Sequence, residues 1–155
     1  MKRFALLLMV LAVPALAPAP ALAAGPVAMA PAPGTPADTI ARQFLAQDLA
    51  EASRAGEKPL VLIGQAPIGR PQDRPALFVQ LQSARECGSG GCATTVLIAS
   101  PQGWRKVLDG VSGAVTVLPT RHKGMADLAA DTERYLWNGQ SYANSRPVPN
   151  VNLRR

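Results

Sequence analysis

Cysteine and histidine are scarce in this sequence, which contains two cysteines and one histidine among its 155 residues. Metal sites in proteins need about four ligands, and Cys87, Cys92 and His122 are too few to supply them. Runs with Asp or Asn at alternate positions, as in calcium-binding loops, are also missing. The sequence therefore predicts neither a metal site nor a cofactor.

A cluster of basic residues is missing too. Lysine and arginine outnumber Asp and Glu by 16 to 10, but they are scattered along the chain, with Arg154-Arg155 as a terminal pair. Scattered charge of this size is typical of a soluble surface, whereas nucleic-acid binding requires a basic stripe or a known module. We therefore predict no nucleic-acid partner. The positive excess favours acidic partners, such as lipopolysaccharide, anionic cell-wall polymers or acidic proteins.

Long apolar segments are missing as well. The run from Phe4 to Leu16 is about 13 residues long, and a membrane-spanning helix needs roughly 20. It follows two basic residues, and Ala21-Leu22-Ala23 has the small-x-small form that a signal peptidase cleaves. We predict a cleaved signal peptide over 1–23, a periplasmic or secreted location and no stable membrane insertion. Cleavage removes Lys2 and Arg3, which lowers the formal charge from +6 to +4.

The mature chain divides into a spacer, one domain and a tail. Residues 24–35 are rich in Pro, Ala and Gly, and this composition predicts a disordered spacer. Thr35 as N-cap and Pro36 at the first helical position begin a predicted helix over 36–55. Its apolar residues recur at helical spacing: Ile40, Ala41, Phe44, Leu45, Leu49 and Ala52.

Short alternating runs separated by turn residues follow, and they predict strands. They are Leu60–Ile63, Ala76–Ser83, Ala93–Ala99, Trp104–Leu108, Ala114–Leu118, Met125–Ala129, Arg134–Trp137 and Gln140–Tyr142. We therefore predict a single α+β domain over 36–145, with one N-terminal helix packed on an antiparallel meander of six to eight strands. Residues 146–155 are expected to form a flexible tail.

The clearest turn signal is Asn138-Gly139, which predicts a two-residue type I′ hairpin. In that register Trp137 faces Gln140, and Tyr135 faces Tyr142 as an aromatic cross-strand pair.

Cys87 and Cys92 flank a loop between two predicted strands, Gly88-Ser89-Gly90-Gly91. In an exported protein the pair is expected to form a disulfide, and a glycine-rich loop lets the two Cβ atoms approach. Redox motifs space their cysteines by two residues, and a P-loop needs Lys-Ser/Thr after its last glycine. We predict a structural disulfide, and we take Gly88, Ser89, Gly90 and Gly91 as the candidate recognition loop.

No catalytic motif is complete. Ser89 and Ser112 stand in C-G-S-G-G and G-V-S-G-A, and neither context matches the G-x-S-x-G nucleophile elbow. Ser112 and His122 with Asp109 or Asp127 contain the residue types of a triad, but most chains of this length do. The basic turn around His122 indicates an exposed loop histidine. We predict no catalytic residues and no enzymatic activity.

Four segments of the later half of the chain carry a resemblance: C-G-S-G-G-C (87–92), Trp104–Leu108, T-V-L-P-T-R-H-K-G-M-A-D-L (116–128) and Y-L-W-N-G-Q-S-Y (135–142). Together they resemble a group of uncharacterised exported bacterial proteins. The shared pattern is a short cysteine loop, a G-x-x-D-L step and a closing hairpin with tryptophan, glycine and tyrosine. The resemblance covers residues 76–142 and implies a fold, not an activity.

The chain also resembles periplasmic inhibitors of vertebrate-type lysozyme, in its size, export signal, N-terminal helix and C-x4-C spacing of Cys87 and Cys92. In that family a disulfide-closed loop carrying a histidine and an acidic residue enters the lysozyme cleft, whereas this loop holds glycine and serine. We expect an exported, non-enzymatic module that binds a periplasmic or envelope protein or an acidic envelope polymer. Lysozyme inhibition through the Cys87–Cys92 loop is the alternative.

Overall fold

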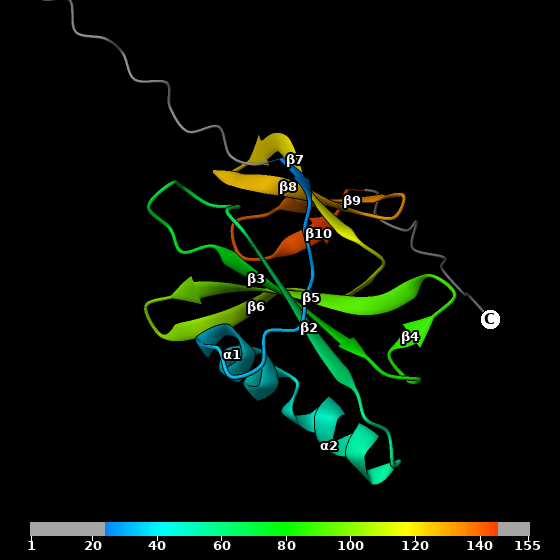
Figure 1. The fold of residues 1–155 in the computed structure, drawn as a ribbon. Helices are drawn as coiled ribbons and strands as arrows, with labels where there is room; N and C mark the ends of the chain where they lie inside the picture. The colour runs from blue at the N-terminus through cyan, green and yellow to red at the C-terminus, as the bar shows by residue number, and fades with distance from the viewer. Residues whose placement is uncertain (1–23, 146–155) are drawn as a thin grey trace, which may run out of the picture.

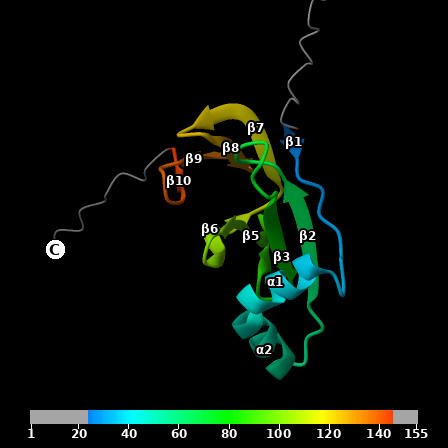
Figure 2. The ribbon, with the colours of Figure 1, turned by 90° about the vertical axis from the view of Figure 1, so that its left-hand side faces the viewer.

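The computed structural model describes residues 24–145, so the predicted signal peptide (1–23) and the predicted tail (146–155) lie outside the described residues. Within the described residues, two short helices and ten strands are arranged in three layers (Figure 1). Two antiparallel sheets stack on each other, and the helices cover the outer face of one of them (Figure 2). The predicted antiparallel pairing is confirmed and the architecture fits an α+β class, but the predicted six to eight strands are too few and the position of the predicted single helix does not match.

The helix-covered sheet lies in the middle layer. Its strands pair in the order β2-β3-β5, with β6 and the short β4 both paired to β5. Their bounds are β2 Leu60–Ala66, β3 Ala76–Gln82, β4 Cys87–Gly88, β5 Gly91–Ser100 and β6 Gly103–Ser112.

The open sheet forms an outer layer and has the order β1-β7-β8-β9-β10. Its strands are β1 Gly25–Pro26, β7 Val115–His122, β8 Met125–Ala130, β9 Glu133–Trp137 and β10 Tyr142–Asn144. Each of the eight predicted strands overlaps one of the longer strands, and the two additional strands, β1 and β4, have two residues each.

The middle sheet is buried on both faces. A strand buried in this way needs apolar residues at almost every position, and β3 has them. Phe78 points into the core between the two sheets, whereas Leu77 and Val79 point into the core under the helices. All three side chains are at most 2% exposed. The two cores together fix the stacking of the three layers.

The predicted single helix over 36–55 is wrong in its continuity. The structure has α1 Pro36–Phe44 and α2 Ala46–Arg54, separated at the buried Leu45. The Thr35 cap is confirmed, because its hydroxyl accepts a hydrogen bond from the Asp38 amide. Neither Gly nor Pro marks the break at Leu45, and the apolar periodicity continues through it.

The predicted disordered spacer over 24–35 is also wrong. Gly25-Pro26 pairs with β7, and Ala30 bridges to Ile63 of β2, so the segment joins an edge of each sheet. Val27 and Met29 pack over Gly64, where a Cβ would lie 2.5 Å from Val27 Cγ1. The missing side chain of Gly64 therefore makes room for this strap, which the Pro/Ala composition concealed.

The β9–β10 connection differs from the predicted two-residue turn. Trp137 faces Tyr142, and residues 138–141 form a four-residue connection. The Asn138 side chain accepts hydrogen bonds from the amides of Gln140 and Ser141, an Asx arrangement that replaces the type I′ turn. The aromatic pair is therefore Trp137 with Tyr142, edge to face at 5.2 Å between centroids.

Candidate functional site

The cysteine loop forms the predicted disulfide. Cys87 and Cys92 face each other across β4 and β5, with their Cα atoms 3.8 Å apart. The tip residues Gly88, Ser89, Gly90 and Gly91 are exposed. One side of the tip nevertheless lies against the β6–β7 connection, because a Cβ at Gly91 would be 3.2 Å from the Gly113 Cα. The disulfide thus fixes a loop whose tip contacts the β6–β7 connection.

Ser112 and His122 lie at opposite ends of the molecule. Ser112 ends β6 beside Gly90 of the cysteine loop, whereas His122 ends β7. His122 does meet Asp127, with Nδ1 2.7 Å from Oδ1. Asp109 hydrogen-bonds elsewhere, to Thr95 and Lys106. Of the residues considered for a triad, the structure brings His122 and Asp127 together, whereas Ser112 lies at the other end of the molecule.

Asp127 is fully buried although it lies on a strand of the open sheet. The register of β7 and β8 shifts between Val117 and Arg121, so residues 118–120 lie opposite Asp127 alone. Pro119 is part of this irregular stretch, and proline has no N–H to donate to a ladder. The resulting bulge gathers side chains of β7 over the carboxylate.

Three side chains satisfy the Asp127 carboxylate. His122 contacts Oδ1, and Arg134 Nη2 donates to Oδ2 at 2.6 Å. Burial, the strongest single influence, raises the pKa of Asp127, but hydrogen bonds from Thr120, Arg134 and His122 together hold this pKa below its ordinary value. The carboxylate therefore stays ionised and fixes two outward-facing side chains, since His122 and Arg134 are 47% and 43% exposed.

Basic side chains gather at the end of the two sheets that carries the β7–β8 turn. This cationic end comprises Arg70, Arg74, Arg105, Arg121 and Lys123, which come from the β2–β3 connection, the start of β6, the end of β7 and the β7–β8 turn. The β2–β3 connection and the β5–β6 turn lie on the same side of the fold, and β4 lies on the opposite side (Figure 1). Antiparallel pairing thus brings together residues that are scattered in the sequence.

Main-chain oxygens hold three of these cations in place. The contacts run between neighbouring connections: Arg121 Nη2 to Gly69 O at 2.7 Å, Lys123 Nζ to Asn138 O at 2.5 Å, and Arg105 Nη1 to Gln140 O at 2.6 Å. Arg105 also lies 5.5 Å from the centroid of the Trp137 ring. Neutral acceptors orient these side chains without cancelling their charge.

The charge of the domain is unevenly divided. Residues 24–145 contain 11 Lys/Arg and 10 Asp/Glu side chains. At the cationic end, five basic groups meet one carboxylate, Asp73, which is paired with Arg70 at 3.1 Å. This end therefore has an excess of four positive charges, and the remainder has an excess of three negative charges. A near-neutral average over residues 24–145 thus conceals an uneven distribution of charge.

The opposite end is acidic. A groove of about 430 Å³ lies between the end of β6 and the β8–β9 turn, and its acidic side chains are Asp109, Asp131 and Glu133. Burial, together with a hydrogen bond to Glu133, raises the pKa of Tyr135 in this groove to about 12. Ser112 also lines it, so the groove adjoins the cysteine loop.

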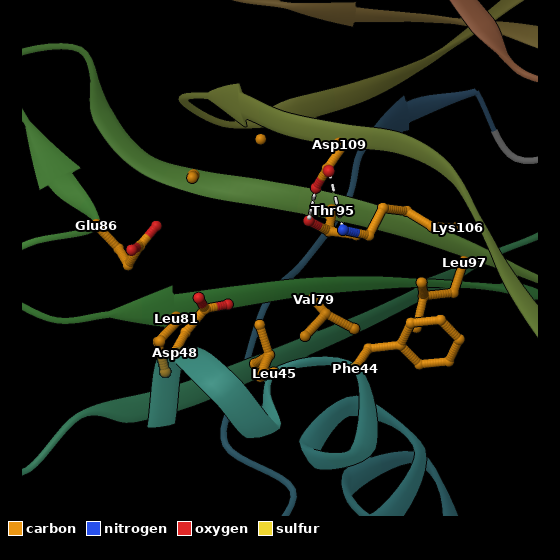
Figure 3. A pocket seen from close by; sticks show the side chains of 12 residues that line it. Phe44, Leu45, Asp48, Val79, Leu81, Glu86, Thr95, Leu97, Lys106 and Asp109 are labelled. Carbon is orange, nitrogen blue, oxygen red and sulfur yellow. Dashed lines mark hydrogen bonds and ion pairs between the residues drawn. The ribbon is translucent and has the colours of Figure 1, made fainter. Parts of the chain in front are cut away.

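A smaller cavity of about 80 Å³ lies between the helices and the middle sheet (Figure 3). Thr95 and Lys106 converge there on Asp109, with hydrogen bonds of 3.1 Å and 2.8 Å. Leu45 and Val79 form part of its apolar wall. A cavity of this size has room for water molecules.

Among residues 24–145, no group of three or more His, Cys, Asp and Glu side chains is placed to hold a metal ion. The two described helices are too short to cross a membrane. Comparison of the chain with protein-family models, with curated proteins and with solved structures finds no match.

Sequence reasoning missed the cationic end and the role of Arg134. The five basic residues lie up to 53 positions apart, from Arg70 to Lys123, so no local cluster was visible. Asp127 was considered only as a triad member. The one local signal was the run Arg121-His122-Lys123, from which the sequence predicted an exposed loop histidine and no basic binding site.

Proposed function

We propose that this protein is an exported, non-enzymatic binding module whose cationic end contacts an anionic component of the cell envelope. The observation that carries the proposal is the excess of four positive charges at one end of a domain that is otherwise negative. An uneven field of this kind orients the protein toward an anionic surface and raises the rate of encounter.

The manner in which the cations are held supports a binding role. Arg105, Arg121 and Lys123 donate to carbonyl oxygens, so their positions are fixed while their charges are not neutralised. Groups already held in place lose less conformational entropy when a ligand binds. Guanidinium groups also suit phosphate and carboxylate, because their planar array of N–H donors matches two oxygens at once.

The test is binding of long-chain polyphosphate to the protein, measured by calorimetry at several salt concentrations. Arg74→Ser combined with Lys123→Asn removes two exposed charges from the cationic end, and Asn tolerates the positive φ of 46° at position 123. Each basic residue near an anionic surface contributes about 1 kcal/mol, so we expect affinity to fall at least tenfold.

Arg54→Ser combined with Lys58→Ser is the matched control, since it removes the same charge from the exposed end of α2 and the residues after it. We expect its affinity to stay within twofold of the parent. Equal losses in the two double variants would mean that net charge alone drives binding, and absence of binding by the parent protein would overturn the proposal.

Lysozyme inhibition through the Cys87–Cys92 loop remains a second candidate. It is supported by the exposed tip and by the acidic groove beside it, which suits a basic partner. The test is muramidase activity in the presence of the purified protein. No inhibition at micromolar excess would exclude this function and leave the first proposal untouched.

A further inference from the structure

A ligand-sized cavity with apolar walls lies at the junction of the helix layer and the middle sheet. It has a volume of about 330 Å³ and is bounded by the first turn of α1, by β2, by the start of β3 and by β6. This volume falls at the small end of the range for ligand pockets in proteins, about 300–1,000 Å³. The pocket adjoins the cationic end, because Arg74 belongs to both.

The walls of this pocket are apolar. Ile40 of α1 and Trp104 of β6 are half-buried, and Leu77 of β3 is 2% exposed. The two tryptophans of the protein differ in this respect. Trp137 is buried against Tyr142, whereas Trp104 lines the cavity. Apolar walls around a space of this size are suited to an alkyl chain, and each buried methylene contributes about 0.8 kcal/mol.

The charge at the rim of the pocket indicates which chemical group would lie outside it. Arg74 is exposed there, and the neighbouring carboxylate of Asp73 is bound by Arg70. The nearest acid on α1, Asp38, is 7% exposed and is bound by Arg42 and the Gly34 amide. The charge that faces the pocket mouth is therefore positive, and it complements an anionic group.

We infer that this pocket binds the alkyl chain of a single-chain lipid with an acidic headgroup, and that Arg74 contacts the headgroup. The inference rests on the proposed function and narrows it from an anionic envelope component to an anionic amphiphile. A volume of about 330 Å³ suits one alkyl chain, whereas a bilayer phospholipid has two.

The experiment uses dodecyl phosphate below its micelle concentration, with dodecyltrimethylammonium and inorganic phosphate as comparison probes. Calorimetry gives the affinities, and NMR of the indole N–H resonances gives the place of binding. We expect dodecyl phosphate to bind at least tenfold more tightly than either comparison probe. It should shift the Trp104 resonance and leave that of Trp137 unchanged. Similar affinity for dodecyl phosphate and inorganic phosphate would overturn the inference.

Two variants separate the apolar and ionic contributions. Gln65 is exposed at the pocket rim, so Gln65→Trp fills the pocket with little effect on the core. We expect it to weaken dodecyl phosphate at least tenfold and to leave polyphosphate binding unchanged. Arg74→Ser should weaken dodecyl phosphate about tenfold, and Lys58→Ser, its charge-matched control, should not. Unchanged dodecyl phosphate affinity in Gln65→Trp would overturn the inference.

The two proposals fail in different ways. Polyphosphate binding without selective dodecyl phosphate binding would remove the lipid pocket and keep the cationic end as the contact surface. Loss of polyphosphate binding, with dodecyl phosphate still sensitive to Gln65→Trp, would remove the proposed contact with polyanions and keep the pocket.

Discussion

The two ends of the stacked sheets are fixed by different means. At the disulfide end, a covalent bond between Cys87 and Cys92 and close backbone contact at Gly91 hold the connections together. At the cationic end, charged side chains reach across to the main chain of neighbouring connections, as Arg121 does to Gly69. The disulfide end is held without charged side chains. The cationic end is held by charged side chains, which remain at the surface in fixed positions.

The two ends therefore present different surfaces: exposed small residues at the disulfide end and fixed positive charges at the cationic end. Carbonyl-bound cations retain their charge, which favours an anionic partner. Asp127 lies next to the cationic end without being part of it, because its partner His122 ends β7 between Arg121 and Lys123.

Asp127→Asn should produce the largest loss of stability. Removing one partner of a buried ion pair costs about 3–5 kcal/mol, and we expect about 3 kcal/mol here, because Arg134 and His122 can turn to water. Urea unfolding followed by circular dichroism measures the change. Asp131→Asn is the control: it is exposed at a positive φ of 51°, which Asn tolerates, so its free energy of unfolding should change by about 0.5 kcal/mol or less.

Acidification should remove the same contribution. The pKa of Asp127 is lower in the folded protein than in the unfolded chain, so its stabilisation is complete above the ordinary carboxyl pKa, about 3.9, and is lost as the pH falls through the folded value. Unfolding midpoints at pH 7, 5 and 3 should therefore fall more steeply for the parent than for Asp127→Asn. Parallel pH profiles would contradict the assigned role.

Removing the disulfide should lower the free energy of unfolding and leave the cationic end unaffected. The chain-entropy model gives a loss of about 2 kcal/mol for Cys87→Ser combined with Cys92→Ser, because the closed loop is short. Polyphosphate affinity should stay within twofold of the parent, as measured by the same calorimetry. A parallel loss of stability and of polyphosphate binding would show that the two ends are not independent.

Features set by neighbouring residues were predictable from the sequence. Thr35 caps α1 because a hydroxyl and a proline precede the apolar periodicity, and the eight longer strands follow alternation that is written locally. The disulfide was predictable because four residues, three of them glycine, separate the cysteines.

Features set by distant residues were not predictable. The strap over 24–35 is ordered because Gly64 leaves space for Val27 and Met29, and that pairing leaves no local trace. Asp127 stands at a position that alternation assigns to the solvent face, and the bulge of β7 buries it. The cationic end exists only after antiparallel pairing has brought three connections together.

Two glycines of the same loop give the smallest and most local test. Gly91 has φ +100°, and a Cβ there would lie 3.2 Å from Gly113, whereas Gly88 has open space around it. Gly91→Ala should therefore lower the free energy of unfolding by about 1–2 kcal/mol, the usual cost of placing an L-residue in the left-handed region, and Gly88→Ala should change it by about 0.5 kcal/mol or less. Thermal and urea unfolding of both variants decide the matter. Equal effects would mean that the disulfide alone fixes this end and that contact with the β6–β7 connection contributes nothing.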